Sequence, residues 1–563
     1  MFLFFTITLL AFLVTQYFFK PAPALKSVAP PITSKNAAAL VAKPAPLQPE
    51  ATGTPTVVAP PTTAQAETLY TIDTDVFHVV ATNKGAFVKS WVLKKYKDSD
   101  GRPLDLVNTA AGALPGPFAI DLKDQKTSID DPNAVLYVAT PTPDKLGISF
   151  EYSDGKTTVR KSIQFGQKSY LCDVRSEVVS NGTPVSHLLM WRGGFGDETV
   201  RNAYGNQHTV HYDATTSKLI KKNAKDAKNA PVQEIGNFTF AGLEDNFFAA
   251  VALPAGPANS VEVRTYDDQL TITGESKPEA FVGGGVSTGS QNQFSLFVGP
   301  KDIDLLRKVS PKLEQLVDWG YFGLIAKPLF LWLNWVNDHW TNNFGWAIIV
   351  VTAIINILLL PFKFTSLRSA RKMQKIAPQI KAINDKYKNV SMRDPKAAEK
   401  NQEVMALYKQ NGVNPVGGCL PLLVQLPFFY AFYRVLSIAT ELRGASWLWV
   451  NDLSRPESLA IHLLPIILIA TQFLMQKMTP AAGVDPSQQK MMQFMPLIFG
   501  SMFYYAPAGL VLYWLTGNVV GVMQQMVINR FMPLPVPPPQ EVPEKISSSK
   551  APAKAPVNRS SKR

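Results

Sequence analysis

Five long apolar stretches follow Asn343 and constrain the fold of this chain more than any other feature. They lie at about 344–362, 417–438, 459–475, 491–506 and 508–529. Stretches of this length and composition predict helices that cross a bilayer. The fourth has about 16 residues and would cover about 24 Å as a helix, against a hydrocarbon layer of about 30 Å. We therefore expect a helical membrane core with hydrated ends or a locally thinned bilayer.

Positive charge is concentrated beside these stretches. The chain has 56 Lys and Arg against 43 Asp and Glu, a formal net charge of +13. Many of the basic residues lie between Lys363 and Lys409 or after Arg530, and both segments belong in the cytosol by the positive-inside rule. The positive charge therefore indicates the membrane topology. It does not indicate binding to a specific nucleic-acid sequence. Alternating the spans puts the N-terminus in the cytosol, and it puts the residues between the N-terminal apolar run and Asn343 outside, in the periplasm if the cell has one.

Residues 1–20 predict an N-terminal transmembrane anchor. Residues 2–19 are uncharged and apolar, near the length that crosses a bilayer. A cleaved signal peptide is the alternative, because Ala22-Pro-Ala24 weakly resembles a cleavage site, but no basic segment precedes the apolar run. Residues 21–66 are rich in Pro, Ala and Thr and cannot bury a core, so we interpret them as a tether.

Residues 67–310 have a different pattern, in which short alternating runs are broken by Gly, Asn, Asp and Pro. Examples are the runs 77–81, 86–93 and 261–266. Many short strands without intervening helices predict an all-β domain built as an antiparallel sandwich. On the topology above, this domain is periplasmic.

The remaining segments are helical or disordered. Residues 311–342 predict an amphipathic helix that lies along the membrane interface. Residues 343–530 form the five-helix core, within which 364–414 is predicted to be a cytosolic helical hairpin. Residues 531–563 are basic and rich in Pro, Ser and Ala, which predicts a disordered cytosolic tail.

The chain carries no enzyme or metal signature. Gly155-Lys-Thr157 resembles the end of a phosphate-binding loop, but Phe150 stands where that motif requires its first Gly. We interpret this stretch as a β-hairpin turn. His208 and His211 are close in sequence but lack further metal ligands. We therefore predict no catalytic residues, no metal and no cofactor.

Polar side chains inside the apolar stretches are the candidate functional residues. The first stretch contains Thr352 and Asn356, and the second contains Arg434. The simplest interpretation is hydrogen bonding between helices, worth about 0.6 kcal/mol per contact. A charge at the bilayer centre costs about 2.5–3.5 kcal/mol and is usually kept for a polar pathway. However, Arg434 lies about 20 Å along its helix from Pro421, close enough to the outer interface to reach Glu441 or water.

Several long motifs resemble those of the YidC membrane protein insertases. The motifs are Asn411-Gly-Val-Asn-Pro-Val-Gly-Gly-Cys-Leu-Pro-Leu-Leu-Val-Gln-Leu-Pro427, Glu441-Leu-Arg443, Asp485-Pro-x-Gln-Gln-Lys490, Phe494-Met-Pro496 and Pro507-Ala-Gly-Leu-Val-Leu-Tyr-Trp514. The resemblance covers about residues 312–530, and the anchor and β domain are similar to the form found in bacteria with an outer membrane. It implies a five-helix core with a groove open to the cytosol and the lipid, and a periplasmic β-supersandwich.

The resemblance also implies a function. It implies a multi-pass inner-membrane insertase and chaperone that moves nascent transmembrane segments from the cytosol into the membrane, alone or with the Sec translocon. The implied partners are nascent membrane proteins, the ribosome, the Sec translocon and the lipid bilayer. Two other interpretations remain: a secondary transporter, although no internal repeat relates two halves of the chain, and a membrane-anchored periplasmic protein that binds or processes sugars.

One departure from the family concerns the groove. The family usually carries an Arg five residues before the Pro that ends the first helix of the core, and counting back from Pro361 gives Asn356. The fixed positive charge of the groove is therefore missing from its usual position. The residues predicted to contact the groove or the substrate are Thr352, Asn356, Gln425, Tyr433, Arg434, Tyr513 and Trp514. Those predicted to form an apolar slide for the inserting segment are Phe428, Phe429, Met495 and Phe503.

Overall fold

The computed structural model describes most of the chain between Pro60 and Phe531. The predicted anchor, nearly all of the tether and the tail lie outside the described residues. The described ranges are 60–98, 101–108, 112, 114–123, 127–197, 207–254, 260–271, 277–387, 395–412, 420–478 and 486–531.

The first part of the described chain consists of β-strands. They are β1 (Leu69–Asp73), β2 (Phe77–Thr82), β3 (Phe87–Lys97), β4 (Pro103–Asp105), β5 (Ala119–Asp121), β6 (Val138–Pro141), β7 (Gly147–Ser153), β8 (Thr157–Phe165), β9 (Leu171–Ser180), β10 (Thr183–Pro184), β11 (Leu188–Trp191), β12 (His208–Asp213), β13 (Lys218–Lys222), β14 (Val232–Gly236), β15 (Phe238–Glu244), β16 (Phe248–Pro254), β17 (Val261–Leu270), β18 (Glu279–Ser287) and β19 (Gln291–Pro300). A single turn of 3-10 helix, η3 (Ala224–Ala227), follows β13.

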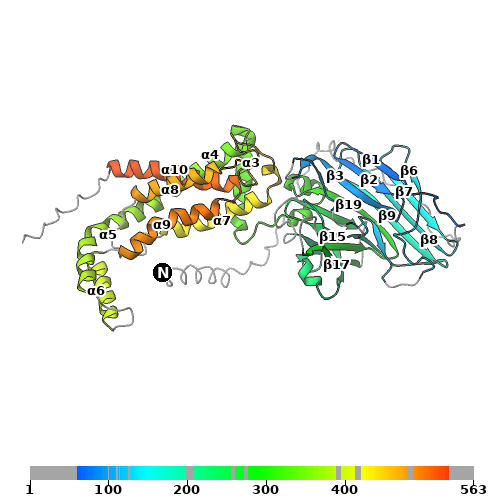
Figure 1. Cartoon of the computed structure of the whole chain (residues 1–563), viewed down its shortest axis with the longest axis horizontal. Helices are drawn as coiled ribbons and strands as arrows, with labels where there is room; N and C mark the ends of the chain where they lie inside the picture. Colours follow the sequence, from blue (N-terminus) through cyan, green and yellow to red (C-terminus); the bar gives the residue numbers. More distant parts are fainter. Residues whose placement is uncertain are drawn as a thin grey trace, which may run out of the picture. The chain divides into compact units, whose positions relative to one another are not determined.

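The strands form three sheets, and every pairing between these strands is antiparallel. The first sheet has the order β1-β2-β3-β4, and the second has the order β13-β12-β15-β16-β19-β9-β8-β7-β6 with β10 paired to β9. The third has the order β14-β17-β18-β11-β5. The prediction of an antiparallel all-β domain is therefore confirmed (Figure 1).

Alternation of side chains explains why these sequences form strands with one buried face. In β2, Phe77, Val79 and Ala81 are buried while His78 between them is exposed. The Phe77 ring packs edge-on against Trp91, with ring centroids 5.5 Å apart. The stretch at Gly155 is a turn between β7 and β8 with a φ of 85°, which confirms the predicted hairpin turn and excludes a phosphate loop there.

Helices make up the rest of the described chain. They are α2 (Ile303–Val309), η4 (Pro311–Leu316), α3 (Gly323–Val336), η5 (Asn337–Thr341), α4 (Phe344–Leu358), α5 (Leu360–Lys386), α6 (Lys396–Gln410), α7 (Leu420–Ile438), η7 (Thr440–Leu442), α8 (Leu463–Met478), α9 (Pro486–Phe503) and α10 (Ala508–Phe531). Helix α10 packs against α4, α7 and α8, and α9 packs against α8 (Figure 1). The helices α4, α7, α8, α9 and α10 correspond to the five predicted spans.

Two boundaries differ from the sequence-based expectation. The interfacial segment is not one helix, because residues 317–322 separate η4 from α3. The first helix of the hairpin begins at Leu360 rather than at 364, directly after α4. Pro361 occupies its first turn, where a missing backbone N–H costs nothing because that group has no partner within the helix. Asn343 is the N-cap of α4, because its side-chain oxygen accepts from the backbone N–H groups of Gly345 and Trp346.

Length and hydropathy single out one described helix, Ala508–Arg530, as able to cross a membrane. The segments Gly323–Thr341 and Phe344–Leu358 pass the same test together but are bent by 115° at the break between them. Leu463–Met478 and Phe494–Phe503 are apolar but shorter. The core therefore contains helices too short to span about 30 Å of hydrocarbon unaided.

The β domain and the helices share buried contacts. Phe240 and Phe297 of the second sheet belong to the same buried apolar cluster as Leu313 of η4 and Leu436 of α7. A buried ion pair adds to this contact, because the Arg443 guanidinium after η7 donates to the Asp197 carboxylate. These two side chains are 4% and 2% exposed. Removing one partner of an ion pair buried this deeply strongly destabilises the folded protein.

Candidate functional site in the helical core

Asn356 of α4 is the centre of a polar group that joins three helices. It is 1% exposed, and its side-chain amide donates to the backbone carbonyl of Thr352 at 2.9 Å. Its Oδ1 accepts from the Lys363 ammonium of α5 at 2.7 Å. Gln524 of α10 completes the group, since its amide nitrogen donates to the Asn356 carbonyl at 3.1 Å and its Oε1 accepts from Lys363 at 3.2 Å.

A second polar contact lies on the same face of α10. The side-chain amide of Gln425 in α7 donates to the Tyr513 hydroxyl at 3.3 Å. One turn further along α10, a Cβ placed on Gly517 would lie 3.9 Å from Asn356 Nδ2. Positions 513, 517 and 524 are four and seven residues apart and share one helix face. We call the residues that make these contacts the polar seam: Thr352, Asn356, Lys363, Gln425, Tyr513 and Gln524.

Two of the four predicted apolar residues lie together around Trp514. Phe429 of α7, Phe503 of α9 and Trp514 of α10 form one aromatic cluster, with centroid distances of 4.9 Å for Phe429–Trp514, 5.2 Å for Phe503–Trp514 and 6.0 Å for Phe429–Phe503. Phe503 is only 3% exposed, so it packs inside the core. Phe428 and Met495 are half-buried.

Arg434 and Tyr433 lie away from the seam. The Arg434 guanidinium pairs with the Asp318 carboxylate at 2.7 Å and also donates to the Asp318 backbone carbonyl at 2.8 Å. Asp318 follows η4, so this pair ties α7 to the interfacial segment. The partner is therefore Asp318 and not Glu441. Tyr433 is 44% exposed, and its backbone carbonyl accepts from Ser437.

The structure thus brings together four of the predicted polar residues, Thr352, Asn356, Gln425 and Tyr513, and adds two that sequence reasoning left out of the site. Lys363 lies one residue beyond the predicted end of the first core span and falls in the predicted cytosolic segment. The signal that could have found it is its spacing, because Lys363 follows Asn356 by seven residues, two helical turns on one face. Gln524 lies within the last predicted span, at about 508–529, but is not among the predicted site residues.

Charge in the seam comes from one side chain. Lys363 bonds to two neutral amide oxygens, and within the described ranges no Asp or Glu lies within ion-pair distance of it. Over the same ranges, no group of three or more His, Cys, Asp or Glu could hold a metal ion. The arrangement can therefore bind water and polar groups, and it can attract an anion.

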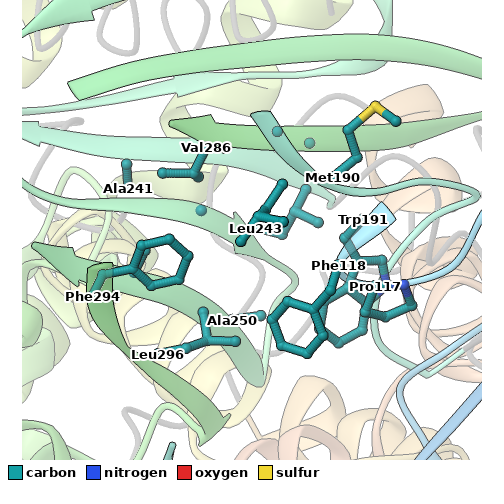
Figure 2. A pocket seen from close by; sticks show the side chains of 15 residues that line it. Pro117, Phe118, Met190, Trp191, Ala241, Leu243, Ala250, Val286, Phe294 and Leu296 are labelled. Carbon is teal, nitrogen blue, oxygen red and sulfur yellow. The ribbon is translucent and has the colours of Figure 1, made fainter. Parts of the chain in front are cut away.

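The β domain contains one described cavity that could serve as an alternative site. The cavity lies between the second and third sheets and is lined by apolar side chains such as Phe118, Trp191 and Leu243 (Figure 2). Its volume is about 50 Å³, whereas pockets for small molecules measure about 300–1,000 Å³. This cavity is too small for a sugar.

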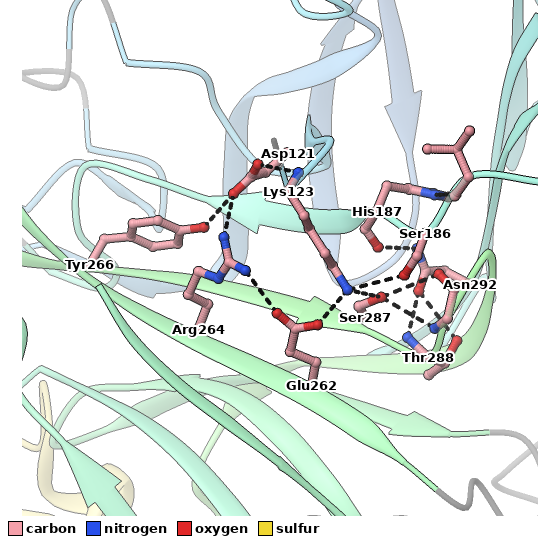
Figure 3. Close-up of polar contacts among 12 residues, drawn as sticks. Asp121, Lys123, Ser186, His187, Glu262, Arg264, Tyr266, Ser287, Thr288 and Asn292 are labelled. Carbon is pink, nitrogen blue, oxygen red and sulfur yellow. Dashed lines mark hydrogen bonds and ion pairs between the residues drawn. The ribbon is translucent and has the colours of Figure 1, made fainter. Parts of the chain in front are cut away.

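A charged network on the third sheet also fails as a sugar site. Arg264 pairs with Asp121 at 3.2 Å and with Glu262 at 3.0 Å, and Glu262 also pairs with Lys123 (Figure 3). The Tyr266 hydroxyl donates to Asp121 at 2.8 Å. The two acids and two bases of this group bind one another, so their charges are paired within the sheet.

Short apolar helices that pack around polar side chains, attached to a large β domain, are the features of an integral membrane protein of the helical class. Comparisons with known proteins agree with this class. Residues 335–535 match the family described as 60Kd inner membrane protein, and residues 69–332 match the YidC periplasmic domain. A membrane protein insertase YidC from Geobacter sp. (strain M21) is 34% identical over 479 residues, covering 82% of this chain and 85% of the relative.

The chain therefore belongs to the family of YidC membrane protein insertases. A crystal structure of an active YidC insertase covers 83% of this chain and 94% of its own, at 19% identity and a TM-score of 0.35. A galactose mutarotase related enzyme from Lactobacillus acidophilus covers 41% of this chain at 13% identity and a TM-score of 0.26. Structural similarities this low say nothing about function. Membership of the insertase family favours neither the transporter nor the sugar-processing interpretation.

Proposed function

We propose that this chain inserts nascent transmembrane segments into the inner membrane and that the polar flank of each segment crosses along the polar seam. The observation that carries this proposal is the seam itself, in which α4, α5, α7 and α10 hydrogen-bond through polar side chains at one face of α10. A purely structural core could meet its packing needs with apolar side chains. Family membership supports the activity, and the seam supports the route.

Insertion along the seam needs no nucleotide, because the structure lowers the physical barrier. A polar flank that enters hydrocarbon loses its hydrogen bonds to water, at a cost of several kcal/mol per unsatisfied group. Helix α4 has 15 residues and α8 has 16, about 22–24 Å of helix, so the apolar layer beside them is short. The amides of Asn356, Gln425 and Gln524 supply hydrogen-bond partners within this layer.

The apolar part of the segment would leave the core beside α7 and α9. Phe428, Phe429 and Met495 are half-buried, so part of each side chain is accessible to a segment moving along the helices. The rings of Phe503 and Trp514 pack against the ring of Phe429. We therefore propose that Phe503 lies in the buried layer beneath the slide and does not contact the inserting segment.

The proposed topology follows from charge. The hairpin of α5 and α6 is basic and belongs in the cytosol, with both termini of the chain, and the β domain then lies in the periplasm. Exposed Trp335 and Trp340 near the end of α3 fit the outer interface, where aromatic rings anchor membrane proteins. Labelling of single cysteines from either side of the membrane tests this topology.

The ribosome and the Sec translocon are the proposed protein partners. The exposed bases of the hairpin, together with the tail, could bind ribosomal RNA phosphates without reading a sequence. For the Sec translocon, the support is family membership alone.

Disulfide crosslinking on two faces of α10 tests the route. In a background with Cys172 and Cys419 replaced by Ser, Gly517→Cys places a thiol at the seam, and Val519→Cys places one about 200° away, at a residue that is 42% exposed. A ribosome-held membrane protein with one Cys in its polar flank should crosslink to position 517 and much less to position 519. Equal crosslinking at both positions, or none at 517, would rule out the seam as the route.

A further inference from the structure

A basic stretch occupies one edge of the second sheet of the β domain. Residues 218–228, which include β13 and η3, contain five Lys and one Asp. The carboxylate of that acid, Asp226, accepts a hydrogen bond from the Asn223 backbone N–H at 2.8 Å. Strand β13 is the last strand in the order of its sheet, so one of its sides pairs with no strand in the described part of the chain. Lysines on an edge strand oppose the addition of a further strand, which makes this edge unsuited to a partner that adds one.

The five lysines differ in what they contact. The Lys221 ammonium pairs with the buried Glu244 carboxylate at 2.6 Å, and the Lys222 ammonium lies 3.9 Å from Glu234. The other three are exposed, and over the ranges that the structure describes no carboxylate lies within ion-pair distance of them. We call these three the basic edge: Lys218, Lys225 and Lys228. Their charges are available to a partner outside the chain.

Strand β13 lies next to the segment that is predicted to run along the membrane interface. Leu219 packs against the apolar cluster that η4 and α3 share with the second sheet. Glu244 is held by a second base, since the Lys301 ammonium lies 3.2 Å from it. That ammonium also donates to the backbone carbonyl of Leu316, the last residue of η4, at 3.5 Å. The pair of Lys221 and Glu244 is therefore joined to the interfacial segment through one further side chain.

This position brings the basic edge within range of lipid headgroups. Four residues of chain span at most about 14 Å, which limits the distance between the backbones of Lys221 and Lys225. The headgroup layer is about 5–7 Å thick on each side of the hydrocarbon, and the field of its charges extends about 8–10 Å into the solvent. The flexible four-carbon stem of each lysine lets its ammonium reach further.

We propose that the basic edge binds the phosphate groups of anionic phospholipids and so holds the β domain against the leaflet on its own side of the membrane. The charges are complementary, because anionic headgroups attract clustered lysines beside a membrane segment. The bilayer is the occupant that we infer, since the same chain spans it and the basic edge follows directly on the contacts with the interfacial segment. This contact depends neither on the polar seam nor on the route of the inserting segment.

The test measures which lipids lie beside the basic edge in the full chain. In a background with Cys172 and Cys419 replaced by Ser, Asn229→Cys gives an exposed thiol next to Lys228 for a fluorophore. The labelled protein is placed in bilayers that contain a small amount of either phosphatidylglycerol or phosphatidylcholine with a nitroxide on the acyl chain close to the headgroup. The measured quantity is the ratio of quenching, anionic over zwitterionic lipid. This ratio cancels differences in how exposed the fluorophore is.

The original chain should give a ratio of about five at low salt, the preference that one ammonium near a membrane surface provides. Replacing both Lys225 and Lys228 by Gln should bring the ratio to about one, whereas replacing both by Arg should keep it. Raising the salt to about 0.5 M should lower the ratio of the original chain, because salt screens exposed charges.

A matched control removes two lysines from the opposite edge of the sheet. Lys145 and Lys156 are exposed in the turns on either side of β7, and replacing both by Gln should leave the ratio at position 229 unchanged. A fluorophore at Pro143→Cys, in the turn between β6 and β7, should give a ratio of about one.

Two results would overturn the inference. One is a ratio of about one in the original chain at low salt, and the other is a raised ratio that persists after Lys225 and Lys228 are replaced by Gln. A ratio of about one in bilayers, together with protection of the thiol of Asn229→Cys from a soluble reagent in native membranes, would show that a protein covers the basic edge instead. Both Gln variants alter exposed side chains, so loss of folding does not enter the comparison.

Discussion

Replacing Asn356 by Leu removes the acceptor that holds the Lys363 ammonium in the seam. The side chain of Asn356 makes two hydrogen bonds, one to the Thr352 carbonyl and one to Lys363, and Leu makes neither. A hydrogen bond to a charged group contributes about 1.5–3 kcal/mol. Gln524 alone would then hold the ammonium, at the longer distance of 3.2 Å.

This loss sets the expected size of the effect. A change of 1.4 kcal/mol is tenfold in an equilibrium constant, so the equilibrium constant for holding the ammonium in the seam should fall at least about tenfold. We expect Asn356→Leu to slow insertion by up to about the same factor. Asn356→Arg should be tolerated, because it places a cation directly in the seam and the flexible Lys363 side chain can turn toward the cytosol.

Arg434→Gln is the matched comparison and should retain most insertion. Its ion pair with Asp318 is partly exposed, at 24% and 50% for the two side chains, and pairs of this kind contribute about 0–1 kcal/mol. The assay is insertion of a pulse-labelled substrate in a strain depleted of its own insertase, scored by protease access to the crossed flank. Loss of insertion in Arg434→Gln with full insertion in Asn356→Leu would reverse these roles.

Further predictions concern the β domain, the tail, the buried pair of Asp197 and Arg443, and Glu441 of η7. Deleting about residues 70–300 should leave insertion intact, because the seam lies entirely outside them; loss of insertion at normal expression would place part of the function in the β domain. Removing the tail after Arg530 should weaken salt-sensitive cosedimentation with ribosomes, and unchanged cosedimentation would leave the tail merely solvated. Asp197→Ala should destabilise the protein by about 3 kcal/mol by stranding the buried charge of Arg443, measured as urea unfolding in detergent, whereas Asp197→Glu should cost less. Burial raises the pKa of Glu441 to about 7, so the folded state binds its proton more tightly than the unfolded state; stability should fall as pH rises from about 4.5 to 7 and level off above, and Glu441→Gln should remove this slope in thermal unfolding.

Hydrophobic pattern was enough to predict most of the architecture. The alternating runs at 77–81 and 261–266 lie in strands β2 and β17, and each apolar stretch overlaps one of the five core helices. These patterns are local, because burial of one face of a strand or helix is encoded within a few neighbouring residues. The break between η4 and α3 was missed for the same reason, since it depends on contacts with distant segments.

The site could be predicted only in part because its contacts join residues far apart in sequence. Gln524 meets Lys363 across 161 positions, and Arg434 meets Asp318 across 116. No periodicity within one helix indicates such partners. Lys363 also falls outside the predicted first span, which ends at about 362, whereas Pro361 lies in the first turn of a helix that continues to Lys386.

The same continuity gives the chain a mechanical property. Helix α5 has 27 residues and is about 40 Å long, with the Lys363 ammonium near one end and the hairpin contacts of Ile376 and Ile380 further along it. One helix therefore carries both the ammonium of the seam and the first half of the hairpin, and Pro378 marks the point between them where this helix can bend. Bending at Pro378 would let the hairpin move while the first turns of α5 keep the Lys363 ammonium at Asn356.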